Sequence, residues 1–188
     1  MSRIRLRAAL PEDAPLLRSW DEAEHVVAAD PNDDWEWESE LARTPDWREQ
    51  LMAELDGRPI GLVQIIDPAL EDGHYWGDCG SGQRAIDIWI GPADCLGRGF
   101  GTTMMQLALA RCFAAPEVQA VLIDPLASNI AAQRFYARLG FRFVEARRFG
   151  DDDCHVMRLE RCDWQSAATP GTNPDARRAA DTQHDLGT

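Results

Sequence analysis

The alternation of hydrophobic and polar residues predicts a series of strands along the chain. At the N-terminus Ile4 and Leu6 alternate with arginines, and a period of two is typical of a strand with one buried face. Apolar, β-branched runs predict further strands at 50–55, 60–66, 84–90, 118–123, 141–147 and 154–160. Two hairpins are expected, across Asp56-Gly57-Arg58-Pro59 and across Gly150-Asp151-Asp152-Asp153.

Residues with helical spacing lie between these strands. A first helix opens at Pro11-Glu12-Asp13, because proline is tolerated in the first turn and acidic side chains favour the positive end of a helix. A second runs from Thr102 to Cys112, with its apolar side chains on one stripe. A third is capped by Ser128 and ended by Gly140. The order of elements predicts an α/β (α+β) domain over residues 1–164, in which helices pack on the faces of a mixed sheet.

Length and composition indicate one globular domain followed by a tail. The chain has 188 residues, of which 45% are hydrophobic, enough for one buried core. No apolar run approaches the roughly 20 residues of a membrane helix, and the N-terminus lacks a signal-peptide pattern, so we expect a cytoplasmic protein. From residue 165 the chain is rich in Ala, Thr, Pro and Gly, which predicts a disordered tail over 165–188. A monomer and a homodimer are both compatible with the sequence.

Charge and cysteine content exclude several classes of function. All 19 basic residues are arginine, which excludes a P-loop and Schiff-base chemistry because both need a lysine. With 32 acidic residues the net charge is −13, which disfavours nucleic-acid and membrane partners and suits a cationic one. The five cysteines are odd in number and none belongs to a C-x-x-C pair, so we expect neither a disulfide framework nor a metal site.

An acidic segment with two tryptophans precedes the second predicted strand. Residues 12–40 hold eleven acidic side chains and one arginine, with Trp35 and Trp37 among them. The segment is either a solvated helix–loop–helix surface or a lid whose indoles and carboxylates hold a polycation. The glycine-rich connection over 67–83 is a second candidate for a functional loop.

The segment Leu96-Gly97-Arg98-Gly99-Phe100-Gly101-Thr102 is the most informative part of the sequence, and it lies between a predicted strand and a predicted helix. Glycines let backbone N–H groups approach a phosphate, and the N-terminus of a helix adds partial positive charge. Arg98 and Thr102 offer further donors. The segment predicts a pyrophosphate site, with a glycine-rich turn without a ligand as the alternative for the loop taken alone.

Together with a second motif, this loop resembles the GNAT superfamily of acyl-CoA-dependent N-acetyltransferases. The second motif is the N-x-x-A-x-x-x-Y-x-x-x-G-F pattern of Asn129, Ala132, Tyr136, Gly140 and Phe141. The resemblance covers about residues 3–162, and it departs at Leu96, where the family usually has Arg or Gln. It implies acetyl-CoA as the co-substrate and a mixed, mostly antiparallel sheet with helices on both faces.

The resemblance also implies which residues hold acetyl-CoA. In the family the glycine loop binds the CoA pyrophosphate, and a backbone amide of the preceding strand, at Trp89 or Ile90 here, polarises the acetyl carbonyl. The expected cofactor-binding residues of this chain are Trp89, Ile90, Arg98, Gly99, Phe100, Gly101, Thr102 and Asn129.

A narrower resemblance, to the aminoglycoside 6'-N-acetyltransferases, rests on three further segments. These are residues 85–91 around Asp87, Ile123-Asp124-Pro125 before the second motif, and His25-Val26-Val27. The resemblance implies an enzyme that acetylates the 6'-amine of aminoglycoside antibiotics by direct attack in a ternary complex, and so confers resistance. Two alternatives stay open: a GNAT enzyme for another amine, such as a polyamine, a peptide N-terminus or a metabolite, and a non-catalytic module that binds acyl-CoA.

Acetyl transfer to an amine needs one group that takes a proton and another that stabilises the leaving thiolate. Asp87, in an apolar strand, is the predicted base, with a purely substrate-orienting role as the alternative. The resemblance implies that Tyr136 donates to the thiolate, with packing in the core as the alternative. The predicted substrate-binding residues are acidic or aromatic: Trp35, Glu36, Asp72, Tyr75, Trp76, Asp87, Asp124 and Asp152.

Overall fold

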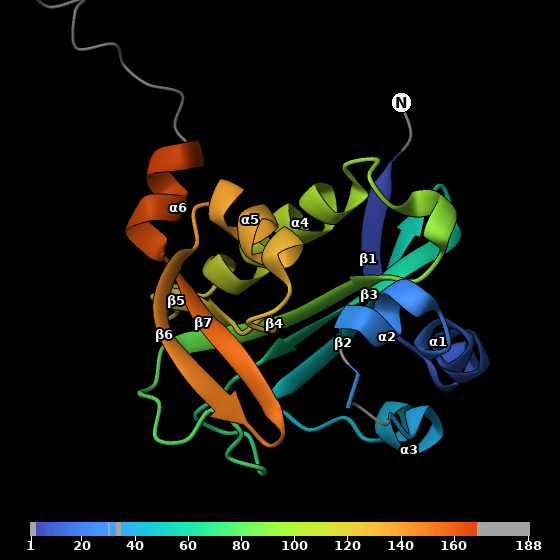
Figure 1. Ribbon diagram of the computed structural model, residues 1–188, viewed down its shortest axis with the longest axis horizontal. Helices are drawn as coiled ribbons and strands as arrows, with labels where there is room; N and C mark the ends of the chain where they lie inside the picture. The colour runs from blue at the N-terminus through green and yellow to red at the C-terminus, as the bar shows by residue number, and fades with distance from the viewer. Residues whose placement is uncertain (1–2, 30, 33–34, 169–188) are drawn as a thin grey trace, which may run out of the picture.

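The computed structural model describes residues 3–29, 31–32 and 35–168, whose strands form one sheet in the order β1-β2-β3-β4-β5-β7-β6 (Figure 1). The strands are β1 (Ile4–Ala8), β2 (Arg48–Leu55), β3 (Arg58–Ile66), β4 (Gln83–Ile90), β5 (Ala120–Ile123), β6 (Arg142–Phe149) and β7 (Asp152–Glu160). The helices are α1 (Ala14–Asp21), α2 (Glu24–Ala29), α3 (Trp37–Ala42), α4 (Phe100–Ala114), α5 (Ile130–Arg138) and α6 (Arg161–Ala168). Two short 3₁₀ turns, Pro11–Asp13 and Ala93–Cys95, lie before α1 and α4.

Helices cover both faces of this sheet (Figure 1). The larger core lies between the sheet and helices α4 and α5, and it includes Ile86 and Leu109. On the opposite face α1 and α3 pack on β2, β3 and β4 through Leu17 and Trp37. A third cluster, on the same face as the second, joins the loop 67–82 to the β6–β7 hairpin. In the described sheet β4 and β5 are the only parallel neighbours, so the predicted mostly antiparallel sheet with helices on both faces is confirmed.

The parallel strands β4 and β5 stay together over only part of their length. Their ladder runs from the pair Gln83 and Ala120 to the pair Ala85 and Leu122. Beyond it β4 continues beside β3 as far as Ile90, whereas β5 ends one residue later. Figure 1 shows β4 running on across the molecule beyond the short β5. The two strands therefore diverge and leave a split in the middle of the sheet.

The structure corrects several predicted ends of elements. α4 begins at Phe100 rather than Thr102. The cap of α5 is Asn129 rather than Ser128, because Asn129 Oδ1 accepts a hydrogen bond from Ala132 N at 3.0 Å. β7 begins at Asp152, so this residue lies in a strand and not in the hairpin turn as predicted.

Helix α6 was not predicted, and it continues through Ala168, past the expected domain end at residue 164. Its first residue, Arg161, donates to the backbone carbonyls of Phe113 (3.0 Å), in the last turn of α4, and of Val118 (2.6 Å), after this helix. These bonds hold the start of α6 against α4 and involve residues more than 40 positions away in the chain. The rest of the predicted tail, 169–188, lies outside the described residues. None of the described helices is long and apolar enough to cross a membrane.

The residue after β4 has to be glycine. Gly91 is buried, and a Cβ at this position would overlap the indole of Trp20 on α1. Trp20 is itself buried in the core between α1, α3 and the sheet. The contact therefore sets how closely α1 approaches the end of β4.

We expect Gly91→Ala to lower the free energy of unfolding by about 1–3 kcal/mol, because the added methyl group overpacks this contact. Urea denaturation measures the change. The matched control is Gly80→Ala, where a Cβ meets no atom within 4 Å, and a surface change of this kind stays within about 0.5 kcal/mol. Equal stability of the two variants would contradict the assignment.

Candidate active site

The register of β3 and β4 decides which backbone groups face the split. Gly91 N donates to Ile60 O (3.1 Å), in line with the ladder between the two strands. Because hydrogen-bonded pairs alternate along antiparallel strands, the amide of Trp89 also points toward β3, whereas that of Ile90 points away from it. The Ile90 carbonyl accepts from His25 Nε2 of α2 at 2.8 Å, which places it on the split side as well. Of the two amides predicted to polarise a carbonyl, only that of Ile90 faces the split, and that of Trp89 is held in the sheet.

The glycine loop leads into α4 without a side-chain cap. Gly99 is the N-cap residue of this 15-residue helix, with φ = +80°, and no side chain accepts from the amides of the first turn. Gly97 is also left-handed (φ = +67°), and a Cβ at either glycine would meet no atom within 4 Å. The Arg98 guanidinium lies 4.9 Å from the centre of the Phe100 ring, at the edge of the loop. Uncapped amides at the positive end of a helix are suited to an anion, and the pyrophosphate site stays a prediction.

Gly101 joins this anion site to β4 and α5. A Cβ at Gly101 would lie 3.7 Å from the side chains of Ile90 and Phe135, so the three elements meet there. Thr102 is half-buried in the same turn. Asn129 is one of the residues predicted to bind the cofactor. In the structure its side-chain oxygen caps α5.

Tyr136 lies on the α4–α5 face of the sheet, and two carboxylates near the split affect the pKa of its phenol. Its side chain is buried, with the ring centre 5.1 Å from that of Phe135 and 5.9 Å from that of Phe141. Burial raises the pKa of the Tyr136 phenol above its usual range, and the negative charges of Asp87 and Asp124 raise it further. The phenol therefore keeps its proton at neutral pH.

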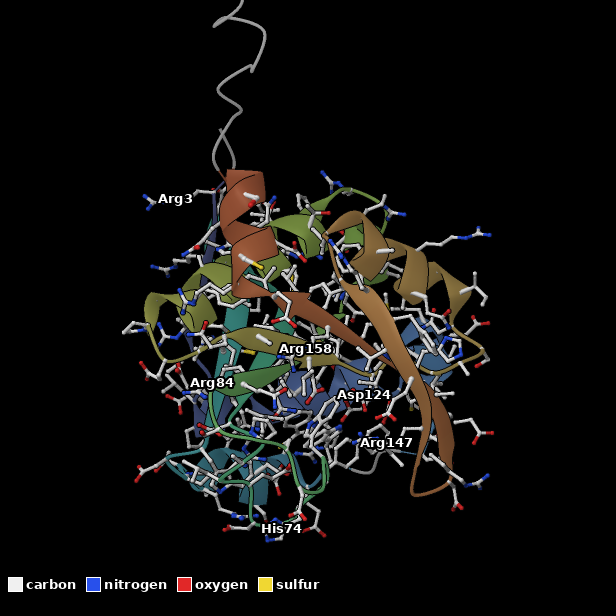
Figure 2. All side chains as sticks on the ribbon, turned by 90° about the vertical axis from the view of Figure 1, so that its left-hand side faces the viewer. Arg3, His74, Arg84, Asp124, Arg147 and Arg158 are labelled. Carbon is white, nitrogen blue, oxygen red and sulfur yellow. The ribbon has the colours of Figure 1, made fainter. Side chains whose placement is uncertain are left out.

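Asp124 follows the end of β5, and a phenol holds its carboxylate. Tyr75 of the loop 67–82 donates its hydroxyl to Asp124 Oδ2 at 2.7 Å. The Tyr75 ring is stacked on Phe149 of β6, with centres 4.4 Å apart and planes 6° apart. Burial raises the pKa of Tyr75, and Asp124 and Asp87 raise it further. Figure 2 shows Asp124 well inside the outline of the molecule. His74, which belongs to the same loop as Tyr75, lies at the outer edge.

Tryptophans line the two sides of this region, and the structure gives them unequal roles. Trp35 is half-buried and stacks on Trp37 (5.1 Å) and Trp89 (6.4 Å). Trp37 is only 1% exposed and belongs to the core. Trp76, predicted to contact a substrate, is 4% exposed, and its ring packs edge-on against Tyr75. Trp76 therefore supports the Tyr75 ring from within the third cluster.

The remaining predicted acids are spread around this region. Asp87 is half-buried on β4, directly across from Gln64 of β3. Asp152 accepts from Asn32 Nδ2 at 2.6 Å, which ties the β6–β7 hairpin to the segment between α2 and α3. Glu36 is exposed at the start of α3 and Asp72 is exposed in the loop. In the described part of the chain, no hydrogen bond or ion pair joins these last two to the other predicted site residues, and no group of three or more His, Cys, Asp or Glu side chains is arranged to hold a metal ion.

One residue of this region, Gln64, was missed from the sequence. Its side chain is fully buried although it is polar. The available signal was its position inside the otherwise apolar run Ile60–Ile66, where an amide needs a partner. Its hydrogen-bond partner Gln50 and its cross-strand neighbour Asp87 lie on neighbouring strands and could be identified only from the register.

Comparisons with known proteins agree on the family of this fold. Residues 9–149 match the acetyltransferase (GNAT) domain family. An aminoglycoside N(6')-acetyltransferase type 1 from Klebsiella pneumoniae is 30% identical, with 73% of each chain covered. A kanamycin resistance protein from Rhizobium radiobacter is 37% identical over a shorter stretch, which covers 38% of this chain and 68% of that protein.

Solved structures show the same similarity. The aminoglycoside acetyltransferase AAC(6')-Ib in complex with coenzyme A is 26% identical and has a TM-score of 0.78, with 89% of this chain and 100% of that chain covered. The same protein has been solved with coenzyme A and kanamycin together, with the same TM-score of 0.78. An uncharacterised protein from Bacillus halodurans reaches a TM-score of 0.80 at 17% identity, which shows the shared fold.

The environment of the two tyrosines can be tested by alkaline titration. The chain has only Tyr75 and Tyr136, and both have a raised pKa. We expect the folded protein to form no tyrosinate near pH 10, the ordinary pKa of tyrosine, and the urea-unfolded protein to titrate there. Ultraviolet difference absorbance follows the ionisation.

Asp124→Asn removes a negative charge beside both phenols, so at least one tyrosine should then titrate at lower pH. Tyr136→Phe assigns the signal of Tyr75. A tyrosine that titrates near pH 10 in the folded wild-type protein would contradict the raised pKa values described above.

Proposed function

The chain belongs to the GNAT acetyltransferase family, and we propose that it transfers the acetyl group of acetyl-CoA to the 6'-amine of an aminoglycoside. The observation that carries the proposal is the convergence of Asp87, Asp124 and Tyr136 at the split between β4 and β5, where the charges of both carboxylates act on the phenol. The similarity to aminoglycoside 6'-N-acetyltransferases in sequence and structure supports the choice of substrate.

The residues around the split suit acetyl-CoA. The uncapped amides after Gly99 are donors for the pyrophosphate, since their positive helix end attracts phosphate oxygens. The Ile90 amide, which points away from β3, is a donor for the acetyl carbonyl. The proposal includes a cytoplasmic enzyme, because acetyl-CoA is made and used in the cytoplasm.

In the proposed reaction the ammonium group of the acceptor first releases one proton to solvent and becomes the neutral amine that attacks. Asp87 takes a proton from the amine as the amine nitrogen bonds to the thioester carbonyl carbon. Tyr136 gives its phenol proton to the sulfur as the C–S bond breaks, so that the thiol of CoA leaves. Asp87 then loses its proton to solvent and Tyr136 regains one, and the net change is an acetamide, CoA and one proton released from the ammonium.

The acceptor side fits a multiply charged sugar. Asp124 and Asp152 provide carboxylates on two different walls of the region, the end of β5 and the start of the hairpin strand β7. Tyr75 is 48% exposed, so part of its ring is available for a sugar face. Contacts between an ammonium group and an aromatic ring contribute about 0.5–2 kcal/mol.

A thiol-release assay with acetyl-CoA tests the function. We expect release with kanamycin, and none with an otherwise similar aminoglycoside that carries a 6'-hydroxyl in place of the amine. Spermidine and a peptide N-terminus should react at least ten times more slowly at equal concentration. Preferred turnover of spermidine or the peptide would assign the enzyme to another amine, and no release with any amine would indicate a non-catalytic module.

The same assay tests the protein's net charge of −13. Attraction between this surface and a polycation is screened over about 8 Å at physiological ionic strength. The KM for kanamycin should therefore rise with salt, and the KM for acetyl-CoA, an anion held by local donors, should rise less. A kanamycin KM that is indifferent to salt would argue against a polycationic acceptor.

The two proposed proton carriers should affect kcat more than KM. Asp87→Asn keeps the shape of the side chain and removes its basicity, and Tyr136→Phe removes only a hydroxyl. General acid–base groups contribute about 10²–10⁴-fold, and water replaces part of the phenol's effect, so we expect the lower end for Tyr136→Phe. Asp124→Asn is the matched control and should mainly raise the KM for the aminoglycoside. An Asp87→Asn enzyme with a raised KM for the aminoglycoside and an unchanged kcat would make Asp87 a binding residue.

A further inference from the structure

We propose that Gln64 is a positioning residue for Asp87, whose side-chain amide holds the aspartate carboxylate in its charged form. The inference rests on the proposed function in one respect only, the identity of Asp87 as the base. The structural part, a donor buried beside this carboxylate, stands independently of what the enzyme acetylates.

A row of polar side chains crosses three neighbouring strands. Gln50 of β2 is paired with Gln64 of β3, and Gln64 with Asp87 of β4. Residues directly opposite one another share a face of the sheet, with Cβ atoms about 5 Å apart. The three strands run side by side in Figure 1. The row therefore ends at Asp87, which lies on β4 just beyond the end of its ladder with β5.

Only one end of the Gln64 amide has a partner. Its Oε1 accepts from Gln50 Nε2 at 3.1 Å. Its Nε2 is buried and has no hydrogen-bond partner among the residues that the structure describes. A buried donor without an acceptor is costly, and such groups are rare in folded proteins. The position is polar although its neighbours along the strand, Val63 and Ile65, are apolar.

Two simpler roles for Gln64 are inconsistent with these observations. A space-filling role is served better by leucine or methionine, which leave no donor without a partner. A direct contact with the acceptor substrate is excluded because the side chain is fully buried. The neighbour that remains on the same face toward the split is Asp87, which lies directly opposite Gln64 in the register of β3 and β4.

The chemical consequence follows from the groups around Asp87. Asp124 at the end of β5 carries a like charge, and the phenols of Tyr75 and Tyr136 face the same region. Partial burial and a neighbouring carboxylate both favour the protonated form of an aspartate, in which it is no base. A hydrogen bond from Gln64 to the charged form opposes them and lowers the pKa of Asp87.

The test measures the pKa of Asp87 directly. Protein labelled with ¹³C at aspartate carboxyl carbons is titrated by NMR, and Asp87→Asn assigns the signal. In Gln64→Met, which keeps the size of the side chain and removes the donor, we expect the pKa of Asp87 to rise by about one unit, a tenfold change in proton affinity. Gln64→Asn, which retracts the amide by one methylene group, should give the same direction and serves if the methionine variant fails to fold. Gln50→Met, which leaves Gln64 facing Asp87, should give a smaller change.

Kinetics then separate this inference from the proposed function. In Gln64→Met the acid limb of kcat/KM should move to higher pH by the same amount, with the KM for acetyl-CoA unchanged. In an Asp87→Asn background the Gln64 substitution should have no further effect on kcat. An unchanged pKa of Asp87 in both Gln64 variants overturns the inference even if the enzyme acetylates kanamycin. A shifted pKa without kinetic effect leaves Gln64 beside Asp87 but removes Asp87 as the base, which is a failure of the proposed function.

Discussion

The divergence of β4 from β5 is the constraint on which the rest of the structure depends. A parallel pair normally continues as a ladder, but here pairing stops at Ala85 and Leu122, and β4 goes on with one edge turned away from any described strand. Backbone groups buried at such an edge need partners from elsewhere. His25 provides one for the Ile90 carbonyl. The first turn of α4 meets the end of β4 at Gly101, where a Cβ would lie 3.7 Å from the Ile90 side chain.

The split also brings together side chains that a continuous sheet would separate. Tyr136 belongs to the core on the α4–α5 face, whereas Asp87 points to the face covered by α1 and α3. A closed ladder would keep backbone between them, yet the charge of Asp87 acts on the phenol. One proposed proton carrier, Tyr136, is therefore supported by an apolar core, while the other, Asp87, lies on the face that carries the polar and aromatic side chains. The packing on each face of the sheet is therefore independent of the chemistry proposed for the other face.

Local patterns in the sequence predicted most strands and the glycine loop before α4, because both depend on residues close together in the chain. Strand alternation, helix-opening residues and the glycine loop are all signals of this kind. The predictions that failed concern features that depend on contacts with residues far away in the chain. Trp76 is buried in a cluster with Phe149, and α6 begins where Arg161 donates to the Phe113 carbonyl in the last turn of α4. Gln64 acquires meaning only when the register sets it against Asp87. Asn129 could be expected either to bind the cofactor or to cap a helix. The structure shows it as the cap of α5.

The charges at the split couple the two proposed proton transfers. While Asp87 is negative it raises the pKa of Tyr136, so the phenol and the carboxylate hold the protonation states that the reaction needs at the same neutral pH. When Asp87 takes the proton of the amine its charge disappears, and one cause of the raised phenol pKa disappears with it. Tyr136 becomes a better acid at the moment when the sulfur needs a proton. The negative charge of Asp124 is a further cause of the raised pKa of the Tyr136 phenol. In the proposed reaction, the order of the two transfers therefore follows from electrostatics between groups that do not exchange a proton with each other.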